Sequence, residues 1–135
     1  MILSVFVPGT AAPQGSKRHV GRGILVESSK AVKPWRESIR WAILERWRGP
    51  QMLGPVTVEL QFVMPRPAST PKRSTPPAIK RPDIDKLERA VLDAIGSAGV
   101  WKDDSQVTTL RATKRLAEIG ETPGCRIVVD ADVRA

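Results

Sequence analysis

The sequence predicts a single α+β domain spanning residues 1–135, with a β-sheet of about four to five strands and two main helices. Its length of 135 residues suits one domain with its own hydrophobic core. Apolar residues alternate along several stretches, as expected for strands with one buried face. Along two other stretches they recur every three to four positions, which is typical of amphipathic helices.

The predicted strands share alternating apolar or β-branched residues and are mostly bounded by Gly or Pro. They are residues 2–7, 24–26, 56–64, 107–116 and 125–129. In the first strand Leu3, Val5 and Val7 fall on one face. Cys125, in the last strand, is the only cysteine, so no internal disulfide can form and we expect a buried thiol in a reducing cytoplasm.

The first predicted helix has Pro34 in its first turn and ends near Arg48. Ser28 and Ser29 are the expected caps. The apolar stripe of this helix consists of Trp35, Ile39, Ala42, Ile43 and Trp47. Trp41 lies off the stripe, where it is available to another element or a second subunit.

The second predicted helix runs from about Asp83 to Gly96. Its buried stripe consists of Ile84, Leu87, Ala90, Val91, Ala94 and Ile95. Asp85, Arg89 and Asp93 succeed one another at four-residue spacing along the border of that stripe. We expect Asp93 to be structural, paired with Arg89 or another cation, and Glu88 to be solvated.

Four carboxylates, those of Asp83, Asp85, Asp103 and Asp104, lie close in sequence within a basic chain, which indicates a cation site. If the strand after Asp104 pairs next to this helix's sheet, its turn returns Asp103 and Asp104 beside Asp83 and Asp85. Oxygen ligands suit Mg²⁺ or Mn²⁺ better than zinc. Each residue also has a structural alternative: Asp83 as an N-cap, Asp85 at the positive helix end, and the other two as turn residues.

The chain carries a net charge of +8 and a pI near 10.4, which favours a polyanionic partner such as DNA. Residues 65–82 form a basic, proline-rich loop, for which we favour phosphate binding over an inert linker. The candidate DNA-binding cations in this loop and in the N-terminal loop are Lys17, Arg18, Lys72, Arg73, Lys80 and Arg81.

Other chemistries lack their signatures. His19 is the only histidine, and it lies far from any nucleophile motif. The sequence has no P-loop and no dinucleotide fingerprint, so no nucleotide cofactor is expected, and its apolar start is too short for a membrane span. A carboxylate site in a basic surface instead suits phosphodiester hydrolysis, since cations attract the backbone while carboxylates hold a metal.

Two motifs resemble the signature of the RusA family of Holliday junction resolvases. They are Arg-Pro-Asp-Ile-Asp-Lys-Leu-Glu-Arg-Ala-Val-Leu-Asp-Ala-Ile at residues 81–95 and Gly-Val-Trp-Lys-Asp-Asp-Ser-Gln-Val at residues 99–107. The loop at residues 8–18 looks like that of phage and prophage members. The resemblance implies a mixed sheet and a homodimeric, Mg²⁺-dependent endonuclease that makes paired nicks across a four-way DNA junction in recombination and repair. It also implies a cytoplasmic protein encoded by a bacterium, phage or prophage.

The resemblance further implies that Asp83, Asp85 and Asp104 are catalytic metal ligands, with Asp103 alongside. The family has a functional lysine four residues after the second aspartate, where this chain has Arg89. Arginine neutralises a phosphate but stays protonated. Lys86 and Lys102 are therefore candidates to compensate, and both join the expected DNA-binding residues.

Two alternatives stay open at this point. One is a related metal-dependent nuclease that acts on other branched or flapped DNA in phage genome processing. The other, from a different class, is a non-catalytic DNA-binding or architectural protein whose acidic cluster is structural.

Overall fold

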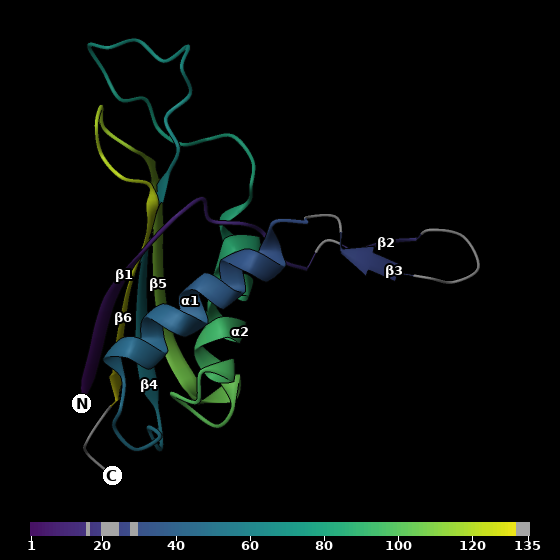
Figure 1. Ribbon diagram of the computed structural model, residues 1–135, viewed down its shortest axis with the longest axis vertical. Helices are drawn as coiled ribbons and strands as arrows, with labels where there is room; N and C mark the ends of the chain where they lie inside the picture. Colours follow the sequence, from purple (N-terminus) through teal and green to yellow (C-terminus); the bar gives the residue numbers. More distant parts are fainter. Residues whose placement is uncertain (16, 20–24, 28–29, 132–135) are drawn as a thin grey trace.

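A four-stranded mixed sheet forms the centre of the computed structural model, which describes residues 1–15, 17–19, 25–27 and 30–131 (Figure 1). The strands lie in the order β1 (Ile2–Pro8), β6 (Gly124–Ala131), β4 (Val56–Met64) and β5 (Val107–Leu116). β6 pairs antiparallel with β1 and β4, whereas β5 pairs parallel with β4. The predicted fold class and four of the five predicted strands are therefore confirmed in this sheet.

Two helices, α1 (Val32–Arg46) and α2 (Ile84–Ser97), pack on one face of this sheet (Figure 1). The inward residues of β4 alternate as predicted, and Val58, Leu60 and Phe62 are fully buried. The outer sheet face is more polar, and it exposes residues such as Thr57 and Gln61. One hydrophobic core thus lies between the sheet and the two helices.

Three short elements complete the fold. β2 (Lys17–His19) and β3 (Leu25–Glu27) form a separate antiparallel ribbon, and β3 corresponds to the short strand predicted near residues 24–26. A 3₁₀ turn, η1 (Asp104–Gln106), leads directly into β5. β2 contains Lys17 and Arg18, two of the predicted DNA-binding residues, and η1 begins at Asp104, one of the predicted metal ligands.

Some details of the predicted elements are wrong. α1 begins after Ala31, whose side chain gives no capping hydrogen bond, and it ends at Arg46. The expected caps, Ser28 and Ser29, lie outside the described residues. Val63 is buried despite its outward position, and it lines a hollow together with Glu121 and Thr122 of the turn before β6. Ile84, expected in the core, is only half-buried because it opens α2 at the edge of the domain.

Three further features of the structure concern Cys125, Trp41 and the two helices. Cys125 is buried, as predicted, and burial raises the pKa of its thiol to about 12. Trp41 is 59% exposed, with the Arg40 guanidinium 5.9 Å from its ring centre. Neither helix of the described residues combines the length and apolar character that a membrane span requires.

Candidate nucleic-acid and metal site

The first turn of α2 presents two exposed carboxylates. Asp83 occupies the N-cap position and Asp85 follows in the first turn. The backbone oxygen of Asp83 accepts the Leu87 N–H at 3.2 Å, but its carboxylate makes no capping hydrogen bond. The positive end of the helix dipole favours negative charge at this position. Both carboxylates are exposed and thus accessible to a cation, and the predicted side-chain cap at Asp83 is absent.

Asp104 lies near the other end of α2. Its Oδ1 accepts a hydrogen bond of 2.8 Å from the buried indole N–H of Trp101. Gly96, in the last turn of α2, faces the same atoms: a Cβ added there would lie 3.0 Å from Asp104 Oδ1 and 3.2 Å from Trp101 Nε1. The missing side chain at Gly96 thus leaves room for a fixed, exposed carboxylate.

Asp103 caps the short helix η1. Its carboxylate accepts the Ser105 N–H at 2.9 Å, and the Gln106 side chain accepts the Asp103 N–H at 3.1 Å in return. The hydrogen bonds from Ser105 hold the pKa of Asp103 below its usual range. Gln106 also donates to the carbonyls of Met52 and Gly54, which fixes the turn against the segment that precedes β4. Within one chain, Asp103 is therefore a turn residue that caps η1, which is the structural alternative to a metal ligand.

The structure separates the two groups of carboxylates. At about 1.5 Å per residue, the stretch of α2 from Asp85 to Gly96 spans about 16 Å. β5 gives a second measure of this separation. It begins close to Asp104, and Lys114 within it contacts Pro82, which directly precedes Asp83. At about 3.3 Å per residue, the stretch of β5 from its start to Lys114 spans about 23 Å. A divalent cation needs its ligands at about 2.0 to 2.6 Å. Within one chain, the carboxylates at the two ends of α2 are therefore too far apart to bind the same ion.

The expected return of Asp103 and Asp104 beside Asp83 and Asp85 is accordingly wrong within one chain. β5 does join the sheet next to β4, but its parallel direction starts it at the C-terminal end of α2. Among the described residues, no group of three His, Cys, Asp or Glu side chains is arranged to hold a metal ion.

Glu88 adds a third acidic group to the first turns of α2. It is half-buried, and its pKa is raised, first by burial and second by the nearby charge of Asp85. The expectation that Glu88 is simply solvated is therefore wrong. A raised pKa beside an exposed carboxylate marks the start of α2 as a place where negative charge accumulates.

Arg89 follows Asp85 by one helical turn and is exposed. Its side chain lies against Gly15, where an added Cβ would stand 2.5 Å from Arg89 Nη1. Gly15 also has a φ of +99°, which favours glycine. The neighbouring Gln14 N–H donates to the Lys86 carbonyl at 3.0 Å. The N-terminal loop thus runs along α2 and sets the position of Arg89.

Asp93 has a structural role, although not with Arg89. Its carboxylate accepts a hydrogen bond from the Gln14 side chain and lies 4.0 Å from Arg36 of α1. Arg36 also donates to Gln14 Oε1 at 2.6 Å. These three side chains join the N-terminal loop and both helices.

The loop at residues 65–82 is pinned by Arg66. Its guanidinium donates to Thr75 Oγ1 and to the carbonyls of Pro71, Ser74 and Ala117, at 2.6 to 3.3 Å. Arg66 is therefore an internal anchor. This part of the loop is built on its own hydrogen bonds.

Lys114 fixes the segment that leads into α2. Its ammonium group donates at 2.9 Å to the carbonyls of both Lys80 and Pro82. Because Asp83 follows Pro82 directly, β5 holds the entry of the helix that carries the carboxylate pair. Lys80 and Arg81 are exposed at this entry and line a cavity at the end of the sheet.

The predicted DNA-binding residues fall into three places. Lys72 and Arg73 are exposed in the loop, and Lys80, Arg81 and Lys86 lie at the entry of α2. Lys102 is exposed beside Asp103, at the far end of α2. For Lys17 and Arg18 the structure describes only the backbone of β2, so the positions of these two side chains lie outside what is described.

Sequence reasoning missed three residues that position this site. Trp101 is one, although a buried indole N–H needs an acceptor, and an aspartate three residues later offers one. Gly96 is another, marked only by a glycine inside a helical pattern. Lys114 carries no local signal, because its contact depends on the parallel pairing of β5 with β4.

The fold and this site define a basic α+β domain that exposes a carboxylate pair at the entry of a helix. The family model described as endodeoxyribonuclease RusA matches residues 7–130, and the chain belongs to this family. The crossover junction endodeoxyribonucleases RusA of Escherichia coli (strain K12) and Shigella sonnei (strain Ss046) are each 45% identical to it over 38 residues. That segment covers 28% of this chain and 32% of either relative, so the match spans about a third of their length.

Proposed function

We propose that this protein is a structure-selective endodeoxyribonuclease that resolves four-way DNA junctions by paired phosphodiester cleavage in recombination and repair. Its family supports this activity, and the curated relatives are named for it. The observation that carries the proposal is the exposed pair Asp83 and Asp85, which has cations on both sides in sequence. Such a nuclease acts on DNA in the cytoplasm of a bacterium, or of the host of a phage or prophage.

The proposed cofactor is Mg²⁺, for which Mn²⁺ can substitute. The Asp83 and Asp85 carboxylates supply the hard oxygen ligands that these ions prefer. A bound divalent cation activates a water molecule and neutralises charge on the phosphate. Exposed Lys80, Arg81 and Arg89 lie within one or two turns of these carboxylates in sequence and would orient the backbone of the DNA.

The separation of the carboxylates favours a homodimer. In a two-fold assembly, whenever one region of the first chain contacts another region of the second, the reciprocal contact also forms. If the start of α2 meets Asp104 of the partner subunit, two equivalent composite sites result. Two such sites match the need to cut two strands symmetrically. β5 is an edge strand whose Leu110 is 37% exposed, so it is available for this contact.

The first test compares wild type with Asp85→Asn on a synthetic four-way junction with Mg²⁺, with linear duplex and flapped DNA alongside. We expect wild type to cut the junction selectively and Asp85→Asn to bind the junction without cutting it. Asp130→Asn, at an exposed aspartate of β6, is the matched control and should cut normally. Equal cleavage of all three substrates would contradict junction selectivity, and unchanged cleavage by Asp85→Asn would contradict the metal-ligand role.

A further inference from the structure

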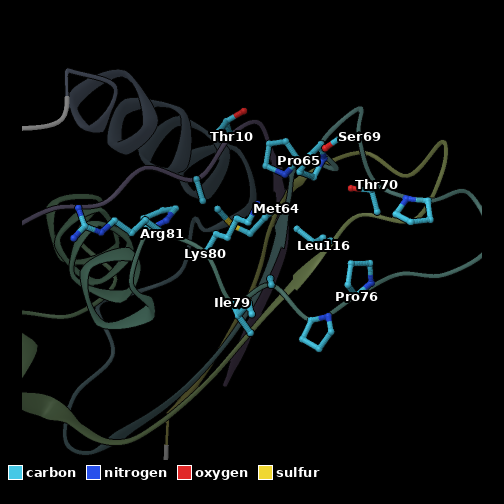
Figure 2. Close-up of a pocket in the computed structure, with 16 residues that line it drawn as sticks. Thr10, Met64, Pro65, Ser69, Thr70, Pro76, Ile79, Lys80, Arg81 and Leu116 are labelled. Atoms are coloured by element: carbon cyan, nitrogen blue, oxygen red, sulfur yellow. The ribbon is translucent and has the colours of Figure 1, made fainter.

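A cavity of about 620 Å³ lies at the end of the sheet, immediately before the carboxylate pair (Figure 2). Its floor is apolar, with Met64 of β4 and Leu116 of β5. Its walls are mainly prolines of the 65–82 loop. This size falls within the range of about 300 to 1,000 Å³ that is typical of ligand pockets.

The two ends of the cavity differ in chemistry. Figure 2 shows Lys80 and Arg81 at one end and Ser69, Thr70 and Pro76 at the other, with Met64 and Leu116 between them. The cationic end continues into Asp83, since Pro82 is part of the lining. A phosphate bound at this end would therefore lie beside the proposed cleavage site.

The cavity is also held in shape without a ligand. Arg66 anchors the loop through four hydrogen bonds, and Lys114 holds the carbonyls of Lys80 and Pro82. A preformed cavity loses less conformational entropy when it binds. Ile79, a further lining residue, is nevertheless 86% exposed, which leaves an apolar lip at the opening.

We propose that this cavity takes up one unstacked nucleobase next to the scissile phosphate, an inference that rests on the proposed function. A base is joined to its phosphate by one sugar, so an apolar cavity beside a cationic rim matches a single nucleotide. Removing a base from a stack costs free energy, and this cost is smallest where stacking is already interrupted. The cavity thereby favours DNA at a branch point over a continuous duplex.

The fluorescent base 2-aminopurine tests this directly, because its emission rises when it leaves a stack. None of the residues lining the cavity is aromatic, so an inserted base would not be quenched again. The probe is placed in turn at each position flanking the branch point of a four-way junction, and protein is added without divalent cation so that the strands stay intact.

Ala78→Phe adds a phenyl ring to the wall of the cavity and narrows it, since Ala78 is part of its lining. Ala68→Phe makes the same change at an exposed residue of the same loop outside the lining, and it is the matched control. We expect wild type and Ala68→Phe to raise the emission at least twofold at one position, whereas Ala78→Phe binds the junction without this rise. Ile79→Ser changes an exposed side chain, so it should fold normally and reduce the rise.

An undiminished rise with Ala78→Phe or with Ile79→Ser would overturn the proposal. Cleavage of the unlabelled junction with Mg²⁺, measured in parallel, separates this failure from that of the proposed function. A wild type that cuts the junction but gives no rise at any position overturns the nucleobase site alone. A wild type that neither binds nor cuts the junction overturns both.

Discussion

The indole N–H of Trp101 donates a hydrogen bond of 2.8 Å to Asp104 Oδ1, and it thereby fixes a carboxylate that is otherwise exposed. Trp101→Phe keeps a buried aromatic ring but removes this donor. A hydrogen bond to a charged group contributes about 1.5 to 3 kcal/mol. We expect junction cleavage to fall about tenfold or more, with the dissociation constant for the junction nearly unchanged.

Trp35→Phe is the control for this variant. Trp35 is also a buried tryptophan, but its indole N–H has no hydrogen-bond partner among the described residues. Both variants shrink a buried ring, so both should lose some thermal stability. Only Trp101→Phe should lose cleavage, and equal losses of activity would contradict the positioning role of Trp101.

Gly96→Ala should separate stability from activity. Alanine favours a helix over glycine by about 1 kcal/mol. The new Cβ would, however, stand 3.0 Å from Asp104 Oδ1 and force that carboxylate to move. We expect an unchanged or higher melting temperature together with cleavage reduced several-fold. A variant that is more stable and also cuts at the wild-type rate would show that the position of Asp104 against α2 does not matter.

Arg89 and Gly15 should act together. Arg89→Lys should cut the junction at close to the wild-type rate if positive charge is sufficient, whereas Arg89→Ala should be strongly impaired. Gly15→Ala should resemble Arg89→Ala, since its Cβ would collide with the guanidinium. Single-turnover cleavage measures all three variants. Normal cleavage by Arg89→Ala would rule out a role for this residue in the reaction.

The cations of the 65–82 loop should divide into an anchor and a DNA contact. Arg66→Ala removes four hydrogen bonds, so trypsin should cut after the exposed Lys72 and Arg73 faster than in wild type. Lys72→Ala should keep the structure but weaken junction binding and reduce the slope of log affinity against log salt by about one. If Arg66→Ala weakened junction binding without faster proteolysis, and Lys72→Ala sped up proteolysis without weaker binding, Arg66 would be the DNA contact and Lys72 the anchor.

Much of the fold could be predicted from the sequence because local patterns determine it. Alternation from Val56 to Met64 predicts β4, and the Thr-rich stretch from Val107 to about Leu116 predicts β5, both with ends that agree with the structure. The period of the apolar residues in α2 identified its buried face, although Ile84 is only partly covered. These features depend on short-range periodicity, which the sequence displays directly.

The arrangement of the site depended on long-range pairing instead. The sequence predicts Asp83, Asp85 and Asp104 as metal ligands, but their separation follows from the parallel alignment of β4 and β5, which no local pattern specifies. Arg66 lies in the same basic loop as the predicted DNA contacts Lys72 and Arg73, and only the folded loop shows that it binds the loop's own carbonyls.

A mixed-dimer experiment tests the composite site most directly. Asp85→Asn and Asp104→Asn chains are each purified, expected to be inactive, then mixed, unfolded and refolded together. In a mixed dimer, one site combines the intact Asp83 and Asp85 of one chain with the intact Asp104 of the other. We therefore predict that the mixture regains nicking of one strand of the four-way junction with Mg²⁺. If cleavage stays absent although mixed dimers form, each site lies within one chain, and a composite site shared between two subunits is contradicted.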